Sequence, residues 1–196
     1  MSSEKTKGKK EEEQLYEPIK SDLMRIFGQY VNKDKKQTYQ REPSPPPEYQ
    51  NVYLEVTAGK HISDILKRQF DNDALYIMRV EGFYPDIMGF VRKEPSDKEL
   101  ITVEVKSIPI AIKHIERAKT YQNVFNATYG LLVSSKGIPE EIRRFVSNRP
   151  KIRGDLIIAH YHLTNPQMPY GVFRIHPDFE PYIPEPFKRF AKPNEY

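Results

Sequence analysis

The sequence contains no cysteine. This absence excludes thiolate zinc sites, iron–sulfur clusters and cysteine nucleophiles, and it is typical of proteins from a reducing compartment. No apolar run approaches the roughly 18 residues that a membrane-spanning helix needs. The charged start, MSSEKTKGKKEEE, lacks the apolar core of a secretory signal. We therefore expect a cytoplasmic protein that makes no membrane contact.

Two familiar glycine motifs are also absent. The sequence has no GxSxG, which marks the nucleophile of α/β-hydrolases, and no GxGxxG, which marks dinucleotide sites. The formal net charge of +4 permits contact with phosphate groups but does not establish it.

The 196 residues suit one domain with tails. Residues 1–13 alternate lysine and glutamate without apolar periodicity, which predicts a disordered charged tail. An α/β domain is expected over residues 14–176, with a polar, proline-rich loop over 32–50. The proline-rich extension over 177–196 is expected to wrap the surface.

Apolar spacing predicts the elements of this domain. Helices are predicted over residues 14–31, 61–70, 109–127 and 139–146. Strands are predicted over residues 52–56, 74–80, 86–91, 100–106, 130–134, 155–162 and 171–175. In the part that leads from the first long helix to the buried strand 130–134, the order helix, three strands, helix, strand predicts an α/β fold with a mixed central sheet and extra elements.

The segment ITVEVKS, residues 101–107, carries the candidate chemistry. Because side chains alternate along a strand, Thr102, Glu104 and Lys106 share one face. A polar turn centred near residues 95 and 96 would pair this strand with the preceding one. That pairing places Asp86 opposite residues 104 to 106. Two carboxylates and one ammonium group then converge at one end of the sheet.

Carboxylate oxygens are suitable ligands for Mg²⁺ or Mn²⁺. A neighbouring lysine can orient or deprotonate an attacking water, or offset charge that develops in the transition state. The set is typical of metal-assisted phosphodiester hydrolysis. A salt-bridged strand surface without catalytic function remains the alternative interpretation.

The motif Pro85-Asp86, followed after 17 residues by Glu104-Val105-Lys106, resembles that of the PD-(D/E)xK nucleases, the restriction-endonuclease-like superfamily. The resemblance extends over about residues 14 to 147. It implies a restriction-endonuclease-like core of helix, three strands, helix and strand. It also implies that Asp86, Glu104 and the carbonyl group of Val105 hold a divalent metal, and that Lys106 acts on the water.

The resemblance implies two further residues. A glutamate on the first helix often completes such a site, and Glu17 in LYEPIK is the candidate. About 40 residues separate that helix from the first motif strand, more than is usual, so Asp64 and Glu81 stay open as alternatives. A polar residue on the helix after the motif often lies near the site, and Gln122 is the candidate there.

A basic cluster late in the chain could bind the phosphate backbone, or could be a solvated helix end. It consists of Arg143, Arg144, Arg149, Lys151 and Arg153. The sequence thus predicts an Mg²⁺- or Mn²⁺-dependent nuclease, with DNA favoured over RNA as substrate. A homodimer is one expectation, because cutting two strands needs two centres. The alternative is a non-catalytic nucleic-acid-binding or protein-interaction module on the same fold.

Overall fold

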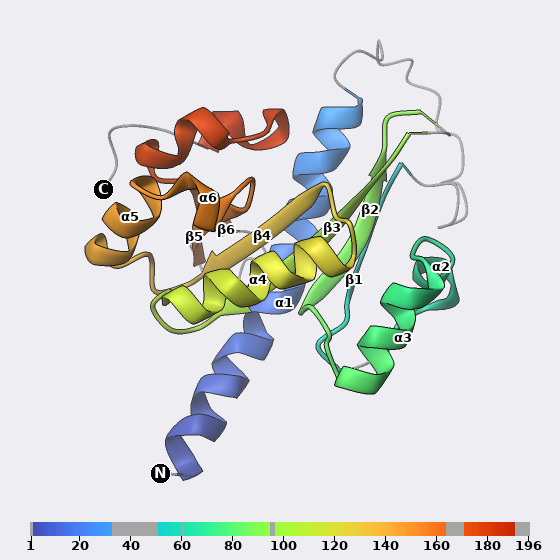
Figure 1. The fold of residues 1–196 in the computed structure, drawn as a ribbon, viewed down its shortest axis with the longest axis horizontal. Helices are drawn as coiled ribbons and strands as arrows, with labels where there is room; N and C mark the ends of the chain where they lie inside the picture. The colour runs from blue at the N-terminus through green and yellow to red at the C-terminus, as the bar shows by residue number, and fades with distance from the viewer. Residues whose placement is uncertain (1, 33–50, 60, 95–96, 164–170, 191–196) are drawn as a thin grey trace.

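The protein has a mixed α/β fold built around one six-stranded sheet, seen in a computed structural model that describes residues 2–32, 51–59, 61–94, 97–163 and 171–190 (Figure 1). The strands follow one another in chain order across the sheet. They are β1 (Val52–Val56), β2 (Ile87–Arg92), β3 (Lys98–Lys106), β4 (Tyr129–Ser134), β5 (Ile157–Leu163) and β6 (Gly171–Arg174). The β3–β4 and β4–β5 pairs are parallel and the other three pairs are antiparallel, so the mixed sheet expected from the sequence is confirmed.

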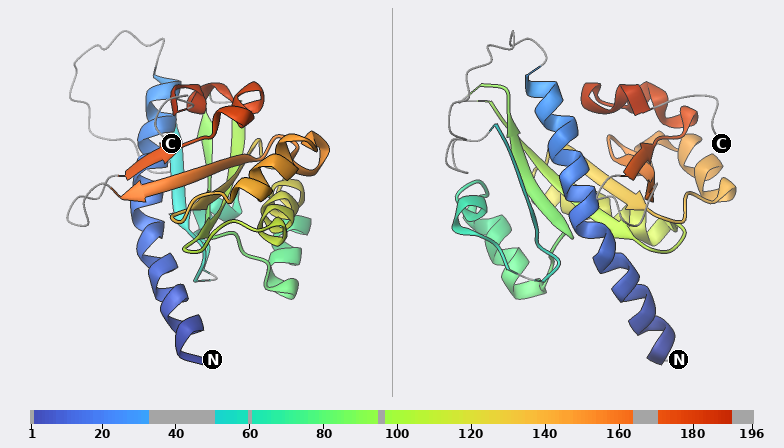
Figure 2. Two further views of the ribbon diagram at one scale, coloured as in Figure 1. Left: turned by 90° about the vertical axis from the view of Figure 1, so that its left-hand side faces the viewer. Right: turned by 180° about the vertical axis from the view of Figure 1, so that it is seen from behind.

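Helices cover both faces of the sheet. The long helix α1 (Ser2–Val31) crosses one face, and α4 (Ile112–Val124) lies over β3 and β4 on the other (Figure 2). The remaining helices are α2 (Asp64–Lys67), α3 (Asn72–Glu81), α5 (Glu140–Ser147) and α6 (Pro150–Arg153). No helix in the part of the chain that the structure describes combines the length and apolar character needed to cross a membrane.

The strand predicted over residues 74–80 is wrong, because this segment forms helix α3. The Asp71 side chain accepts a hydrogen bond from the amide of Ala74 at 2.6 Å, and Gly82 ends the helix in the left-handed conformation with φ of 62°. Ala74 and Met78, four residues apart, are buried on its inner side. The apolar run is therefore one of helical period, and β1 is the first of the three strands that precede α4.

Residues 2–13 are also not the disordered tail that their composition predicts. They form the first turns of α1, without a break before Val31. The physical reason is tertiary contact: Ser107 donates a hydrogen bond to the carbonyl of Gly8 at 2.9 Å, and Lys106 lies 3.2 Å from Glu12. The composition of residues 2–13 cannot predict contacts with residues as distant in sequence as Lys106 and Ser107. Of the loop predicted over residues 32–50, residues 33–50 lie outside the described part of the chain.

The C-terminal segment contributes to the core instead of wrapping the surface. It forms two 3-10 helices, η2 (Pro177–Tyr182) and η3 (Glu185–Phe190). Phe179, Ile183 and Phe187 are buried in the main apolar cluster, and the rings of Phe187 and Phe27 meet edge to face at 5.5 Å. The core therefore continues past the boundary predicted at residue 176.

Helix α1 is fixed across the sheet by Asp22, which is fully buried. One of its carboxylate oxygens accepts hydrogen bonds from the Tyr161 hydroxyl at 2.8 Å and from the Gly171 amide at 2.7 Å, and the other accepts one from Arg25 at 2.8 Å. A buried carboxylate is tolerated only when it is paired and hydrogen-bonded in this way. These bonds hold the helix against β5 and β6 and so set the position of its N-terminal half.

Candidate active site

Asp86 lies directly before β2 and is held by backbone bonds to two other strands. Its amide donates to the Val103 carbonyl at 2.9 Å, and its carbonyl accepts from the Thr57 amide at 2.8 Å. Ile87 pairs with Val103, so Asp86 lies opposite Glu104, within the range that the turn predicted. The register of the hairpin is therefore confirmed.

The carboxylate of Asp86 is almost entirely buried and has two hydrogen-bond donors. Oδ2 accepts from the Val105 amide at 2.7 Å, and Oδ1 accepts from the Tyr16 hydroxyl at 3.3 Å. Burial, and after it the nearby charge of Glu104, together raise the pKa of Asp86 to about 7 against the opposing influence of Lys106. The charge of Glu104 thus opposes the ionisation of Asp86.

Glu104 occupies the middle of the sheet on β3, between β2 and β4, and is 1% exposed. Its Oε1 lies 2.8 Å from Lys106 Nζ and 3.3 Å from Arg117 Nε. Neither contact has hydrogen-bond geometry, and among the described residues neither carboxylate oxygen of Glu104 accepts a hydrogen bond. A buried carboxylate with open lone pairs is costly unless a cation takes them up.

Lys106, at the end of β3, lies among the acidic groups. Besides Glu104, its Nζ lies 3.2 Å from Glu12 and 4.0 Å from Asp86, and it donates a hydrogen bond to the Val105 carbonyl at 2.7 Å. Burial by itself would lower the pKa of Lys106, but the surrounding carboxylates outweigh burial and raise the pKa above its usual value. Lys106 is therefore a cation here, and can donate hydrogen bonds without serving as a base.

The third carboxylate at this site is Glu12, and none of the three candidates taken from the sequence lies there. Glu17 is 67% exposed at its side chain and pairs with Lys20. Asp64 is 80% exposed and pairs with Lys67, while Glu81 is exposed at the end of α3. Glu12 is only 20% exposed and accepts a hydrogen bond from the Tyr16 hydroxyl at 3.4 Å.

A signal for Glu12 is present in the sequence. The buried stripe of α1 includes Leu15, Ile19 and Leu23, and extending its spacing backwards by three or four residues reaches Glu12. Glu17 falls off this stripe, because it lies two residues from Leu15 and from Ile19. Because residues 1–13 are predicted to be disordered, the sequence does not predict Glu12 as a site residue.

On α4, Arg117 and Tyr121 reach the site and Gln122 does not. Arg117 Nε donates to the Tyr121 hydroxyl at 2.8 Å as well as lying near Glu104. Gln122 is buried instead against β4, where a side chain on Gly130 would clash with it, and it accepts a hydrogen bond from Lys119 at 2.9 Å. Gln122 therefore has a packing role in this structure.

His114, in the first turn of α4, reports the local electrostatic potential. Its Nδ1 accepts a hydrogen bond from the Ala111 amide at 3.1 Å. Burial, together with the positive charges of Lys106, Lys113 and Arg117, lowers the pKa of His114 to about 4. His114 is thus neutral at physiological pH, beside a group of cations on this face.

The basic cluster predicted from the sequence is divided by the fold. Arg153 is 2% exposed and donates to the Leu156 carbonyl, so it is a core residue. Arg143 pairs with Asp178, and Arg144 pairs with Glu140. The Arg149 guanidinium lies over the Phe145 ring, and Lys151 is exposed. Within the described residues, no contact joins any member of this cluster to Asp86, Glu104 or Lys106.

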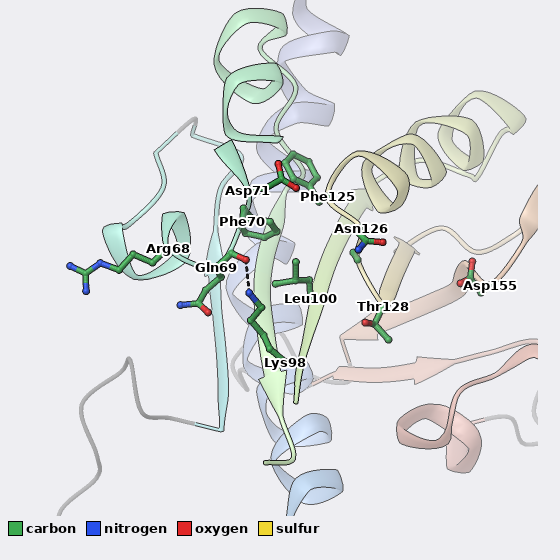
Figure 3. A pocket seen from close by; sticks show the side chains of 11 residues that line it. Arg68, Gln69, Phe70, Asp71, Lys98, Leu100, Phe125, Asn126, Thr128 and Asp155 are labelled. Carbon is green, nitrogen blue, oxygen red and sulfur yellow. Dashed lines mark hydrogen bonds between the residues drawn. The ribbon is translucent and has the colours of Figure 1, made fainter. Parts of the chain in front are cut away.

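A pocket of about 690 Å³ lies at the opposite end of β3 (Figure 3). Lys98, where β3 begins, donates to the Gln69 carbonyl at 2.7 Å, whereas Glu104 and Lys106 are near the end of the strand. The residues that line the pocket include Arg68, Asp71, Leu100, Phe125, Asn126 and Thr128. Cations and carboxylates are mixed there, so the pocket shows no preference for an anion or a cation.

The residues around Asp86 and Glu104 fit a divalent metal ion. Within the described part of the chain, no three His, Cys, Asp or Glu side chains are arranged to hold a metal by themselves. Mg²⁺, however, usually takes only one or two carboxylates and completes its shell with water and substrate oxygens. Asp86, the open oxygens of Glu104 and the carbonyl of Val105 match that requirement.

Comparisons with known proteins add no family to this geometry. No family model matches the chain, no curated protein matches it, and no solved structure matches it. A functional assignment therefore depends on the residues around Glu104.

Proposed function

We propose that this protein is a divalent-metal-dependent nuclease that hydrolyses phosphodiester bonds of nucleic acid on a restriction-endonuclease-like core. The observation that carries the proposal is the convergence of Asp86, Glu104 and Lys106 at one end of the central strands. The order of α1, β1, β2, β3, α4 and β4 supports it, because, apart from α2 and α3 inserted between β1 and β2, this is the order of helix, three strands, helix and strand that the superfamily has.

Burial separates this arrangement from an ordinary salt-bridged surface. Surface ion pairs are solvated on most sides and contribute about 0–1 kcal/mol. Glu104 is 1% exposed, and Asp86 lies opposite it on the neighbouring strand at 8% exposed. Placing two carboxylates side by side in the interior is unfavourable for stability, and such sites are typical of functional centres.

Asp86, Glu104 and the Val105 carbonyl would hold Mg²⁺ or Mn²⁺, with Glu12 next to them. When bound, such an ion acts as a Lewis acid on a phosphoryl oxygen and lowers the pKa of a bound water. The Tyr16 hydroxyl, which donates to Asp86, would fix the orientation of Asp86, and Glu12, which pairs with Lys106, would fix that of Lys106.

Lys106 would orient the attacking water and offset negative charge that develops on the phosphate. Its raised pKa keeps it protonated, which favours hydrogen-bond donation over removal of a proton. A cation held rigidly in a site of low dielectric stabilises developing charge more strongly than the same cation in water.

Cleavage assays test this proposal directly. The full chain is incubated with labelled single-stranded, duplex and branched DNA and RNA, each with Mg²⁺, Mn²⁺ or EDTA. We expect cutting with Mg²⁺ or Mn²⁺ and none with EDTA, and the panel also decides between DNA and RNA. Absence of cutting on every substrate by folded protein would contradict the nuclease and favour a non-catalytic module.

Glu12→Gln is expected to lower the rate of metal-dependent cleavage by about 10- to 100-fold, the usual cost of losing a group that orients metal ligands. The reason is that Glu12 contacts both Lys106 and Tyr16. Single-turnover rates at saturating Mg²⁺ give the measurement. Glu17→Gln is the matched control on the same helix, since among the described residues Glu17 pairs only with Lys20, and it should leave the rate within about twofold. A larger effect of Glu17→Gln than of Glu12→Gln would contradict the placement of Glu12.

A further inference from the structure

Arg117 lies between the buried carboxylate of Glu104 and the solvent. Its side chain is 53% exposed, whereas that of Glu104, 3.3 Å from Arg117 Nε, is 1% exposed. The same Nε donates to the Tyr121 hydroxyl at 2.8 Å, and the guanidinium lies 5.4 Å from the centre of the Tyr121 ring. These two partners fix the direction of an otherwise flexible side chain.

The hydrogen bond through Nε leaves the outer edge of the guanidinium available. Both terminal nitrogens lie on that edge, and no described residue forms a hydrogen bond with them. Two parallel N–H donors of a planar guanidinium match two oxygens of a phosphate group. Arg117 thus presents a fixed phosphate-binding edge next to the buried carboxylate of Glu104.

Lys113 lies one helical turn before Arg117 on α4, and both side chains are exposed. Like charges four residues apart on a helix repel each other. An anionic backbone that passes over this turn of α4 would convert the repulsion into attraction. The pair therefore extends the phosphate-binding surface along one side of α4.

An aromatic ring adjoins the same position. Phe83, three residues before Asp86, is partly exposed and packs on Tyr121 with ring centroids 4.3 Å apart. Aromatic side chains beside cations are the usual platforms for unpaired bases, since every base has a face that can stack. In a duplex the bases are already stacked on one another and their faces are not accessible.

Burial of the two carboxylates favours the same kind of substrate. Asp86 and Glu104 are 8% and 1% exposed, so a phosphate must pass below the protein surface to reach them. A single strand can bend its backbone inward, whereas a duplex presents its phosphates on a stiff, convex surface.

We propose that this site takes an unpaired nucleic-acid strand, with Arg117 and Lys113 binding its phosphates and Phe83 stacking on an adjoining base. The proposal rests on the nuclease function proposed above, because it names the substrate class of that site.

Binding measurements separate this proposal from cleavage. Fluorescence anisotropy is measured on the full chain with Ca²⁺, using a labelled single strand of about 12 nucleotides and a blunt duplex of the same sequence. Intact strand on a gel afterwards shows that none was cut. We expect the single strand to bind at least about tenfold more tightly than the duplex, and Arg117→Ala to weaken single-strand binding by at least about tenfold.

Three further variants identify the cause. Arg117→Lys keeps the charge but loses the planar edge, and should recover only part of the affinity. Phe83→Leu keeps an apolar side chain and should weaken single-strand binding several-fold without changing duplex binding. Lys188→Ala removes an exposed cation from η3 that pairs with Glu185, and it should change affinity by less than about twofold. Melting curves confirm that each variant is folded.

Equal binding of single strand and duplex, no binding of either, or an unchanged affinity in Arg117→Ala would overturn the proposal. These outcomes leave the nuclease proposal intact if duplex is cut with Mg²⁺. Conversely, Arg117-dependent binding of single strands without cutting of any substrate would contradict the proposed nuclease function. It would still support the proposal that the site binds an unpaired strand.

Discussion

Lys106→Ala is expected to lower the rate of Mg²⁺-dependent cleavage by about 10²- to 10³-fold, the range typical of losing one preorganised donor to developing charge. Lys106 is the only cation that contacts Glu12, Asp86 and Glu104 together in the described structure. Its removal takes away the donor that would orient the water. Single-turnover rates on the substrate that wild type cuts best give the measurement.

Two comparisons make this result specific to Lys106. Lys106→Gln keeps most of the side-chain length and one donor without the charge, so a loss in both variants assigns the effect to the charge. Lys67→Ala removes a partly exposed lysine that pairs with Asp64 and should leave the rate unchanged. Retention of more than about a tenth of the wild-type rate by Lys106→Ala would contradict its role, because the lost interaction would then be worth under about 1.4 kcal/mol.

Asp86→Asn is expected to abolish cleavage and, in the absence of metal, to make the protein more stable. The folded-state pKa of Asp86 is raised from its usual value to about 7. The folded protein therefore binds a proton that the unfolded chain has released between about pH 4 and pH 7, and wild-type stability falls as pH rises through that window. The variant has no such titration.

The unfolding free energy gained by the variant should be about 4 kcal/mol larger at pH 8 than at pH 4, since the pKa is raised by about three units and one unit corresponds to about 1.4 kcal/mol. An amide loses part of the hydrogen bonding with Tyr16, which lowers the gain equally at both pH values. Urea unfolding at the two pH values measures it. Added Mg²⁺ should stabilise wild type by about 2.7 kcal/mol at one hundred times its Kd and should not stabilise the variant.

The control is Asp64→Asn, which changes a solvated carboxylate and should show no pH-dependent gain. A variant at position 86 that is less stable than wild type at pH 8 without metal would contradict the strained carboxylate pair. Equal stabilisation of wild type and Asp86→Asn by Mg²⁺ would contradict a metal held by Asp86.

Local rules were sufficient to predict the central hairpin and its three polar side chains. Alternation along β3 sets Glu104 and Lys106 on one face, and the turn near residue 95 sets the register that brings Asp86 opposite Glu104. Both rules depend on residues close in sequence. The mixed sheet follows as well, since a helix between β3 and β4 implies a parallel pair.

Contacts between distant residues decided what the sequence did not predict. Glu12 joins the site because α1 is held across the sheet, and Phe187 is buried because η3 packs on α1. In α3, the caps at Asp71 and Gly82 favour the helix over a strand for an apolar run that periodicity alone leaves ambiguous. Arg117 was overlooked because its partner Glu104 lies on another element.

The bonds that hold α1 also impose an order on synthesis. Asp22 bonds with Tyr161 and Gly171 across 139 and 149 residues of sequence, and Glu12 meets Lys106 across 94. During translation α1 leaves the ribosome first, whereas β6, which helps to hold it, follows much later. Contacts this far apart close slowly. A nascent chain can therefore form the β2–β3 hairpin early, whereas the bonds from Asp22 that hold α1 against β5 and β6 form only after β6 has emerged. The proposed cleavage should accordingly be slower in ribosome-bound intermediates than in the released chain.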